Sequence, residues 1–433
     1  MVKKVAIVGA GPSGVLLAHY LLRRQENYQI DIFDFRSDPR TVAFSKSRTF
    51  PIVLSHRGMK ALRQIEGMEE AVKSISLEMT GSVIHQNNGK TRILNRKYTQ
   101  WSVNRTSLVI TLLEQLSKKS DRQQLNLHFN HQCTQVDLAA KQVKFQKLDA
   151  DAEITVDYDL LIGADGARSV VRASLSKTDN FQCAENYFIN DYKSIFIPPV
   201  EPKLELNWPK DKVHAWRLDD GTNILLVYQT DNSINGVVIF PHHNQIIPQL
   251  ATQPAVSNYF QQYFPEIAQI LPPSAAEDFA NRAVSRVLTV CCNRYHQGNS
   301  VLLIGDAAHA VSPALGQGCN SALEDVTIFN QILDDYDDNL AVAVEQFTRQ
   351  RQADGMAVLE LSNYGLPSSK KLFFEFLLRN ILSQYLHPIL PKVFLPSLFE
   401  ILAEGKHSYS EILNLYQNWI AKVKKSDQKV LSQ

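Results

Sequence analysis

A glycine-bearing turn between two apolar stretches constrains the fold more than any other feature. The segment "KKVAIVGAGPSGVLLAHYLLRR" places Gly9, Gly11 and Gly14 in a G-x-G-x-x-G pattern. In such a turn the first glycine permits the tight bend, the second lets the backbone approach a pyrophosphate, and the third lets helix pack on strand. The free N–H groups at the helix start also favour an anion. The pattern predicts a strand, a turn and a helix that bind a dinucleotide.

An acidic residue at the end of the next predicted strand supports this interpretation. The segment "YQIDIFD" ends on Asp34, 20 residues after Gly14. A carboxylate there can accept hydrogen bonds from the ribose hydroxyls of an adenosine. A glycine-rich turn alone can also bind nothing, but strand, spacing and acid together favour the dinucleotide. Because Arg36 follows two residues later and suits a 2′-phosphate, the kind of dinucleotide stays open at this point.

Two later motifs have the same strand-and-turn character. "YDLLIGADGARSVVR" combines an apolar strand, a turn at Asp165-Gly166 and a helix start. "NSVLLIGDAAHAVSPALGQGCNSALEDV" delivers Asp306 at the carboxyl end of a strand, where ligands of α/β sheets bind. Its loop then enters a helix near Gly318. Gly316 and Gly318 lack the Cβ atoms that would hold the backbone away from a flat ligand.

Together the three motifs resemble the FAD-dependent aromatic monooxygenases of the p-hydroxybenzoate hydroxylase type. Softer stretches such as "TFPIVLSHRGMKAL", "YFPEI" and "YSEIL" are similar in order and spacing to the kynurenine 3-monooxygenase branch. The resemblance implies an α/β fold with a Rossmann-like FAD-binding domain of the glutathione-reductase type. The motifs and the resemblance assign the FAD site to Gly9, Gly11, Ser13, Gly14, Asp34, Phe35, Arg36, Arg105, Asp165, Asp306, Pro313, Gly316, Gly318, Cys319 and Asn320.

The resemblance also implies the chemistry. NAD(P)H reduces FAD, and one oxygen atom of O₂ is inserted into an electron-rich aromatic substrate. Because the cofactor carries this chemistry, we expect no catalytic side chain and no metal site. The helix start near Gly318 suits the negative charge of reduced flavin without any lysine. We interpret His309, directly after a strand, as a structural residue rather than a base.

The substrate side departs from the kynurenine branch. That branch holds a carboxylate with an arginine and a tyrosine from a lid hairpin, where this chain has Ser82 and Arg96. Its N-Y-x-E-M-R motif is replaced by "GLPSSK", and its Pro-Phe-Phe loop reads Pro-Ala-Leu here. Losing a bidentate clamp costs discrimination for a free amino acid. We therefore predict that the substrate is not kynurenine but a larger or less polar aromatic, such as a phenol, an indole or a quinolone-like molecule. The expected pocket comprises Ser82, Arg96, Ala314, Leu315, Gly365 and Tyr409.

Three other functions share this type of fold. A flavin-dependent halogenase would carry a W-x-W-x-I-P segment, which the chain lacks. A flavoprotein reductase of isoprenoid-type double bonds would suit the apolar C-terminal region. A non-enzymatic FAD-binding protein is the third alternative. Oxygen uptake stimulated by substrate separates the hydroxylase from the reductase.

With 433 residues, the chain is longer than one compact core usually holds. "KVHAWRLDDGTNILLVYQTDNSINGVVIFP" predicts an antiparallel meander, and "TGSVIHQNNGKTRIL" predicts a hairpin of the same sheet. The sheet would cover the reactive face of the flavin. We expect a discontinuous FAD-binding domain at 1–75, 101–180 and 285–360, a substrate-binding β-sheet domain at 76–100 and 181–284, and a C-terminal helical cap at 361–433.

Net charge and cysteine content limit which binding partners and which cellular compartment the sequence favours. The net charge of +1 does not point to nucleic acid, and the five cysteines include no CxxC pair, as in a cytoplasmic protein with reduced thiols. The glycines and proline in the N-terminal apolar run argue against a signal peptide. We expect no spanning helix. The apolar C-terminal region fits a packed cap, with an interfacial anchor and peripheral membrane contact as the alternative. The sequence does not indicate the oligomeric state.

Overall fold

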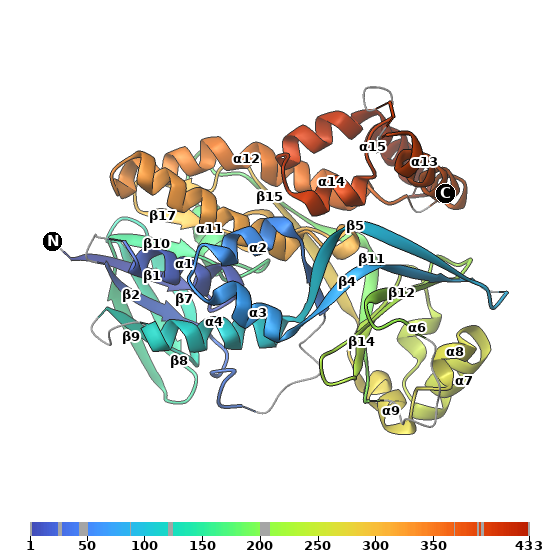
Figure 1. Ribbon diagram of the computed structural model, residues 1–433. Coiled ribbons are helices and arrows are strands. Elements are labelled where there is room, and N and C mark those ends of the chain that lie inside the picture. The colour runs from blue at the N-terminus through green and yellow to red at the C-terminus, as the bar shows by residue number, and fades with distance from the viewer. Residues whose placement is uncertain are drawn as a thin grey trace.

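The computed structural model describes residues 2–24, 28–42, 51–86, 88–119, 124–199, 208–367, 369–387, 389–390 and 394–431. Figure 1 shows a parallel sheet with its helices on one side of the molecule and a second, longer sheet on the other. The C-terminal helices lie along the top of both. This arrangement confirms the expected α/β class with a separate sheet region and a helical C-terminal region.

The first sheet has six strands in the order β16-β17-β10-β1-β2-β6, all parallel except β16. Its central strands are almost continuously apolar and buried, as in sheets that are covered on both faces. Helix α1 (Pro12–Leu22) packs against α4 (Arg105–Lys119) and α11 (Gly318–Asp335). The strands are β1 (Lys3–Val8), β2 (Tyr28–Phe33), β6 (Leu125–His128), β10 (Leu160–Gly163), β16 (His296–Gln297) and β17 (Val301–Leu303).

A three-stranded sheet lies beside β2. The Phe33 ring of β2 stacks on the Phe145 ring at 3.9 Å between centroids. This small sheet therefore packs on the end of β2 that leads to Asp34. It consists of β7 (His131–Asp137), β8 (Gln142–Lys147) and β9 (Ala152–Asp157).

The second sheet has eight strands in the order β15-β11-β14-β13-β12-β4-β5-β3. The register confirms that the meander β12-β13-β14 and the hairpin β4-β5 form one sheet, joined by parallel pairing of β12 with β4. The strands are β3 (Pro51–Leu54), β4 (Ser76–His85), β5 (Thr91–Asn104), β11 (Cys183–Ile197), β12 (Lys212–Arg217), β13 (Asn223–Tyr228), β14 (Ile234–Pro241) and β15 (Ser285–Cys292).

The two edge strands of this sheet come from distant parts of the chain. Strand β3 pairs with β5, and β15 pairs with β11, although the ranges 1–75 and 285–360 were expected to belong wholly to the FAD-binding part. The cause lies in β5 and β11, which have 14 and 15 residues and run from one region into the other. The ends of β5 and β11 pair with edge strands from segments that are far away in the sequence. A local sequence pattern does not reveal such pairing.

The two faces of the long sheet have different neighbours. One face carries the buried side chains Trp216, Ile224 and Phe240, which pack on the helical segment 246–281. This segment forms the four short helices α6 (Ile246–Gln249), α7 (Gln253–Tyr263), α8 (Pro265–Ala268) and α9 (Pro273–Asn281). The opposite face is only half-buried and lies toward the C-terminal helices.

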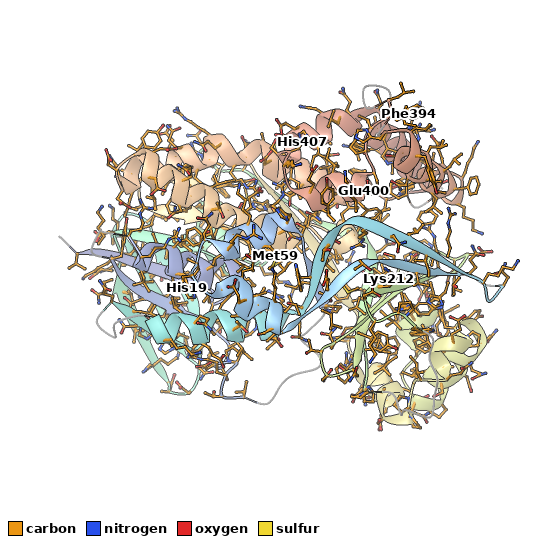
Figure 2. All side chains as sticks on the ribbon, viewed as in Figure 1. His19, Met59, Lys212, Phe394, Glu400 and His407 are labelled. Carbon is orange, nitrogen blue, oxygen red and sulfur yellow. The ribbon has the colours of Figure 1, made fainter. Side chains whose placement is uncertain are left out.

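The C-terminal region is helical, as expected for residues 361–433. Helix α12 (Leu340–Tyr364) leads into this region, which contains α13 (Lys370–Leu386), α14 (Leu398–Glu404) and α15 (Tyr409–Leu431). Helix α14, which carries Glu400, lies against β5 (Figure 2). Within the described part of the chain, none of the helices is both long and apolar enough to cross a membrane.

Candidate cofactor and substrate site

The first glycine loop has three glycines with different local requirements. A Cβ on Gly9, where φ is +111°, would lie 2.3 Å from the Ala164 carbonyl oxygen, and one on Gly14 would lie 2.2 Å from the Gly9 carbonyl oxygen. A Cβ on Gly11 would meet no atom within 4 Å. The packing of the protein itself therefore requires the first and third glycines. The second borders open space, as a site for a pyrophosphate requires.

Asp34 ends β2 directly beside this loop. Its carboxylate accepts the Ala10 N–H at 2.9 Å and the Arg36 N–H at 2.8 Å. It thus fixes the loop, and a carboxylate keeps further lone pairs for ribose hydroxyls. Phe35 is half-exposed, and the Arg36 guanidinium lies 4.5 Å from the centre of its ring. These two flat groups form an exposed stack next to the loop.

The second glycine loop folds back against the first. A Cβ on Gly305 would lie 3.1 Å from Ser13 Oγ, and one on Gly318 would lie 3.9 Å from Asp306 Oδ1. Asp306 opens the short helix α10 (Asp306–His309), and Gly318 opens α11. The start of α11 has no side-chain cap and no acidic residue in its first turn. Its N-terminal N–H groups are therefore suited to an anionic ligand edge.

Residues from three helices converge at the start of α11. Burial raises the pKa of the Cys319 thiol to about 12, with Arg105 opposing the shift and Asp306 adding to it. The Asn320 side chain has internal partners: its amide donates to the Val53 and Gly316 carbonyls at 2.9 and 3.0 Å. Asn320 therefore anchors the loop through its side chain, and only its backbone N–H is left to face a ligand.

Asp165 carries an orphaned acceptor. One carboxylate oxygen, Oδ2, accepts the N–H groups of Val170 and Val171 at the start of α5 (Val170–Leu175). The other, Oδ1, is buried and has no hydrogen-bond partner among the described residues. Burial raises the pKa of this carboxyl group, although hydrogen bonds from Ser169 and nearby N–H groups oppose the shift. The orphaned oxygen, the open space at Gly11 and the uncapped start of α11 fit a bound dinucleotide.

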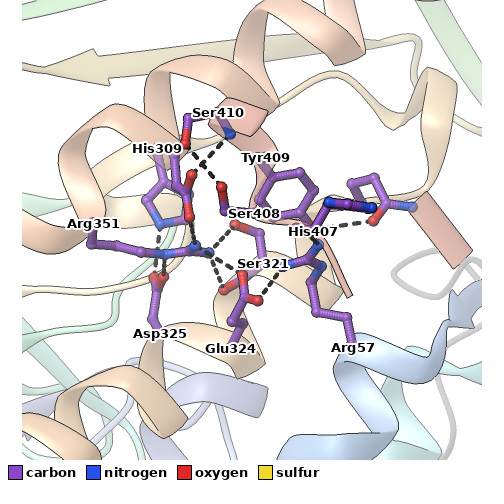
Figure 3. A network of polar contacts seen from close by, with 12 residues as sticks. Arg57, His309, Ser321, Glu324, Asp325, Arg351, His407, Ser408, Tyr409 and Ser410 are labelled. Carbon is purple, nitrogen blue, oxygen red and sulfur yellow. Dashed lines mark hydrogen bonds and ion pairs between the residues drawn. The ribbon is translucent and has the colours of Figure 1, made fainter. Parts of the chain in front are cut away.

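A buried ion network lies behind the second glycine loop (Figure 3). Arg351 of α12 is fully buried and pairs with Asp325, Glu324 and Asp354 at 2.6, 2.8 and 3.1 Å. Asp325, also fully buried, accepts the Gly305 N–H at 2.7 Å and lies 2.7 Å from His309 Nε2. One carboxylate thus connects α12 with the turn before Asp306, and these contacts support a structural role for His309.

The network continues into the C-terminal helices. Arg57 of α2 (His56–Arg63) pairs with Glu324, and it donates to the His407 carbonyl at 2.5 Å. Tyr409, expected in the substrate pocket, is fully buried, and its hydroxyl donates to Gln317 Oε1 at 3.1 Å. Arg57 also lies 4.1 Å from the centre of the Tyr409 ring. In this position Tyr409 supports the second glycine loop through its hydrogen bond to Gln317.

These supporting residues were not predicted from the sequence. The one sequence signal for them was the segment "LED", which contains Glu324 and Asp325 and lies within the motif of the second glycine loop. No local pattern links Arg351 or Arg57 to it, since their partners are 26 and 267 residues away in the chain.

On the substrate side, Ser82 and Arg96 face each other across the hairpin β4-β5. Arg96 Nη2 lies 3.5 Å from Ser82 Oγ, and its Nη1 donates to Gln100. Burial lowers the pKa of the Arg96 guanidinium to about 10. The hydrogen-bond partners described for this half-buried cation are neutral, so it is well suited to receive an anionic or carbonyl group.

Leu315 and Gly365, two further residues of the expected pocket, lie next to each other. A Cβ on Gly365 would lie 2.9 Å from Leu315 Cδ1 and 3.1 Å from Leu398 Cδ2. Leu315 is buried in the apolar cluster of the C-terminal helices, whereas Ala314 is half-buried and Pro313 exposed. Leu315 therefore occupies the space that a larger residue at position 365 would need, and its side chain packs away from the open face of the sheet.

The half-buried face of the long sheet is mainly apolar. Its central residues pair across the ladder and include Val213, Ala215, Leu225, Val237 and Ile239. The C-terminal helices close over its rim. The Arg217 guanidinium lies 4.5 Å from the centre of the Phe373 ring of α13, and the Tyr98 hydroxyl donates to Glu404 of α14 at 2.7 Å.

Two adjoining glycine loops on a parallel sheet, beside a second sheet under a helical cap, form an arrangement suited to a nucleotide cofactor. The chain belongs to the FAD-binding domain family of flavoprotein monooxygenases, whose sequence pattern matches residues 3–336. Kynurenine 3-monooxygenase of Drosophila willistoni is 32% identical over 402 residues, covering 91% of this chain and 86% of the relative. The enzyme of Sus scrofa is 28% identical over 434 residues, covering 97% and 87%.

Solved structures show the same fold. A 2-methyl-3-hydroxypyridine-5-carboxylic acid oxygenase in its tetrameric form has a TM-score of 0.68 at 19% identity, covering 84% of this chain and 90% of that chain. A variant of Klebsiella pneumoniae HpxO complexed with FAD has a TM-score of 0.64 at 18% identity, covering 97% and 98%. The protein is thus an NAD(P)H-dependent flavoprotein monooxygenase with FAD as its cofactor.

Proposed function

We propose that the protein hydroxylates an electron-rich aromatic molecule that is less polar than a free amino acid, and that kynurenine is not its normal substrate. The observation that carries this proposal is the mainly apolar, half-buried sheet face with the half-buried cation Arg96 at its edge. A single guanidinium beside an apolar surface suits an aromatic ring with one acidic or carbonyl substituent.

We further propose that the residues of the two glycine loops hold FAD. Gly11 would admit the pyrophosphate, Asp34 would accept from ribose, and Asp306 would lie along the ribityl chain. When bound, FAD supplies the chemistry by taking a hydride from NAD(P)H and activating O₂. The protein's own part is to orient both molecules. The start of α11 stabilises negative charge on the flavin, and the sheet and cap exclude water.

Arg96 bears directly on the exclusion of kynurenine. Its guanidinium reaches Ser82, so a cation remains near the position where the kynurenine branch has its own arginine. Gln100 already accepts from Nη1, which leaves one donor edge rather than a two-point clamp. Leu315 and Gly365 also replace the residues that close the pocket in that branch. The site therefore allows an acidic substituent but disfavours an amino-acid side arm.

The test is a screen of aromatic metabolites for stimulated NAD(P)H oxidation and O₂ uptake, with mass spectrometry for a gain of one oxygen. We expect phenols, indoles or quinolone-like molecules to be oxygenated. Turnover of L-kynurenine at a comparable kcat/KM would overturn the substrate proposal. NAD(P)H oxidation without substrate-stimulated O₂ uptake would favour the isoprenoid reductase instead.

Arg96 gives the screen a matched pair of variants. Arg96→Leu should raise the KM of an acidic substrate at least about tenfold, because one charge-assisted hydrogen bond is worth about 1.5–3 kcal/mol. A neutral analogue should be affected much less. Arg92→Leu, on an exposed part of the same strand, is the control and should leave both KM values unchanged. Equal effects of the two substitutions would refute a contact between Arg96 and the substrate.

We also propose peripheral membrane contact through α13. Its exposed residues Phe374, Leu378, Leu382 and Tyr385 follow a helical spacing that puts them on one face, and Lys370 and Lys371 begin the helix. The test is co-sedimentation with vesicles that contain anionic lipid. Leu378→Glu should reduce binding, whereas Leu148→Glu, at an exposed leucine of another region, should not. Equal co-sedimentation of both variants with the vesicles would contradict the proposal. Self-association that depends on protein concentration and is lost only in Leu378→Glu would show that this face binds a second copy of the chain.

A further inference from the structure

Two cysteines face each other on the neighbouring strands β11 and β15 at one edge of the long sheet. Cys183 of β11 and Cys292 of β15 are direct register partners, and their sulfur atoms lie 3.1 Å apart. Opposite residues of antiparallel strands have Cα atoms about 4.5 or 5.5 Å apart. Disulfides span about 4.4–6.8 Å between Cα atoms, so the backbone does not need to move. The sulfurs need to approach by only about 1 Å to reach bonding distance.

The pair can be reached from the surface. Cys292 is buried, but Cys183 is half-buried and borders a pocket of about 320 Å³. A pocket of this size admits a small oxidant, and it also admits a thiol reductant. The pocket is lined by Gln182, Cys183, Ala184, Cys291, Cys292, Asn293, Gln352 and Met356.

The surroundings favour reaction at Cys183. A hydrogen bond from the Cys292 thiol lowers the pKa of Cys183 and outweighs the opposing effect of burial, and the charge of Arg172 lowers it further. Arg172 is buried, and it is held by an ion pair with Glu185 at 2.6 Å and a hydrogen bond to the Ala307 carbonyl at 3.0 Å. A thiolate is the reactive form of cysteine, so Cys183 is the nucleophile of the pair.

We propose that Cys183 and Cys292 form a reversible oxidation site that closes to a disulfide with hydrogen peroxide. The Cys183 thiolate attacks one peroxide oxygen, the O–O bond breaks, and the leaving hydroxide takes a proton to give water and a sulfenic acid. The Cys292 thiol then displaces the sulfenic hydroxyl, which leaves as a second water. The two thiols lose two electrons and two protons, and a dithiol reductant reverses the change by exchange.

A source of this oxidant is built into the chemistry of the protein. When bound, FAD would supply hydrogen peroxide whenever its two electrons from NAD(P)H passed to O₂ without oxygenation of a substrate. The proposed site would therefore register unproductive turnover by the same molecule. Its neighbour Arg172 contacts Ala307, directly after Asp306, so the site borders the proposed cofactor loop.

The remaining cysteines provide a contrast within the chain. Cys291 stands opposite Ala184 in the ladder and has no sulfur across from it. Burial raises the pKa values of Cys133 and Cys319 to about 12, which keeps both thiols protonated at neutral pH. We expect Cys183 and Cys292 to react first.

The test uses the purified holoprotein with peroxide added in small molar excess. Thiol counting should show the loss of two of the five thiols, and non-reducing peptide mapping should show one linked pair of peptides, Cys183 with Cys292, 2 Da lighter than the free pair. Dithiothreitol should restore both. A link between Cys183 and Cys291 would overturn the proposal, and so would sulfinic acid at Cys183 with Cys292 still reduced. The proposal would also be overturned if both Cys183 and Cys292 stayed unreacted at a peroxide concentration that oxidises free cysteine.

Matched variants separate the roles. Cys291→Ser should keep the linked pair, whereas Cys292→Ser, which keeps a hydroxyl donor for Cys183 but removes the second sulfur, should stop at a Cys183 sulfenic acid that a 1,3-dione reagent traps. If the substitution of the buried Cys292 impairs folding, the peptide map of the wild-type protein still tests the link between Cys183 and Cys292. Because every readout is thiol chemistry with added peroxide, failure here is distinguishable from failure of the proposed hydroxylase function. A Cys292→Ser protein that yields no sulfenic adduct would contradict the assignment of Cys183 as nucleophile.

Discussion

Replacing Arg351 by methionine tests the buried network behind the cofactor loop. Methionine keeps an unbranched apolar stem but removes the guanidinium that pairs with Asp325, Glu324 and Asp354. Arg351 and Asp325 are both fully buried, so water cannot replace the lost partner. Burial alone would lower the pKa of Arg351, but the three carboxylates raise it. The charged form is therefore the one that the fold stabilises.

The expected loss is about 3–5 kcal/mol, the usual cost of removing one partner of a buried ion pair. For a chain of 433 residues the entropy of unfolding is about 0.9 kcal/mol per kelvin, so the melting temperature should fall by about 3–5 °C. Because Asp325 also accepts the Gly305 N–H next to Asp306, FAD should dissociate more readily as well.

The assay is thermal unfolding followed by circular dichroism at one fixed saturating FAD concentration, together with flavin release followed by fluorescence. Arg349→Met is the matched control, because Arg349 lies on the same helix and pairs with Glu345 while both side chains are largely exposed. Such surface pairs contribute about 0–1 kcal/mol, so the control should melt within about 1 °C of the wild type. If Arg351→Met also melted within about 1 °C of the wild type, the reasoning about buried charge would be refuted.

Two further predictions concern the first loop and the substrate sheet. Gly11→Ala should fold as stably as the wild type yet fail to retain FAD, because its Cβ enters only the space proposed for the pyrophosphate, whereas Gly14→Ala should lose stability too. Retention of FAD by purified Gly11→Ala would refute this. Burial lowers the pKa of His214 to about 4, against 6.5 when unfolded. The unfolded chain then binds more protons between these values, so stability should be complete above about pH 6.5 and fall toward pH 4. Urea midpoints at pH 7 and pH 5 should differ less in His214→Gln, and an unchanged difference would contradict the assignment.

The parts of the fold that the sequence predicted are those with local signals. Gly9 and Gly14 are required by contacts within the first motif and with its neighbouring strand, so their spacing identified the nucleotide-binding turn. The meander and the hairpin followed from alternating apolar residues and turn sequences. The resemblance to known oxygenases supplied the link between the two glycine loops, which no spacing rule could have given.

What the sequence did not predict depends on contacts between distant segments. Strands β3 and β15 join the long sheet through backbone pairing, which leaves no compositional trace. Tyr409 matched a substrate-side position, yet its place is set by Gln317 and Arg57, which surround it in the folded chain. Arg96 was assigned to the pocket, but its approach to Ser82 from the opposite strand depends on the register of the hairpin.

The two long strands restrict how the molecule can open. Strands β5 and β11 each run from the cofactor region into the substrate sheet, so the two regions share continuous backbone at two places, although the β4-β5 and β11-β15 pairings each shift register once along their length. A hinge between them would have to break or bend hydrogen-bonded ladders on both strands at once. The contacts of the cap with the sheet rim, by contrast, are individual side-chain pairs such as Tyr98 with Glu404. We therefore expect the slow conformational step of the catalytic cycle to be movement of the C-terminal helices over a rigid base.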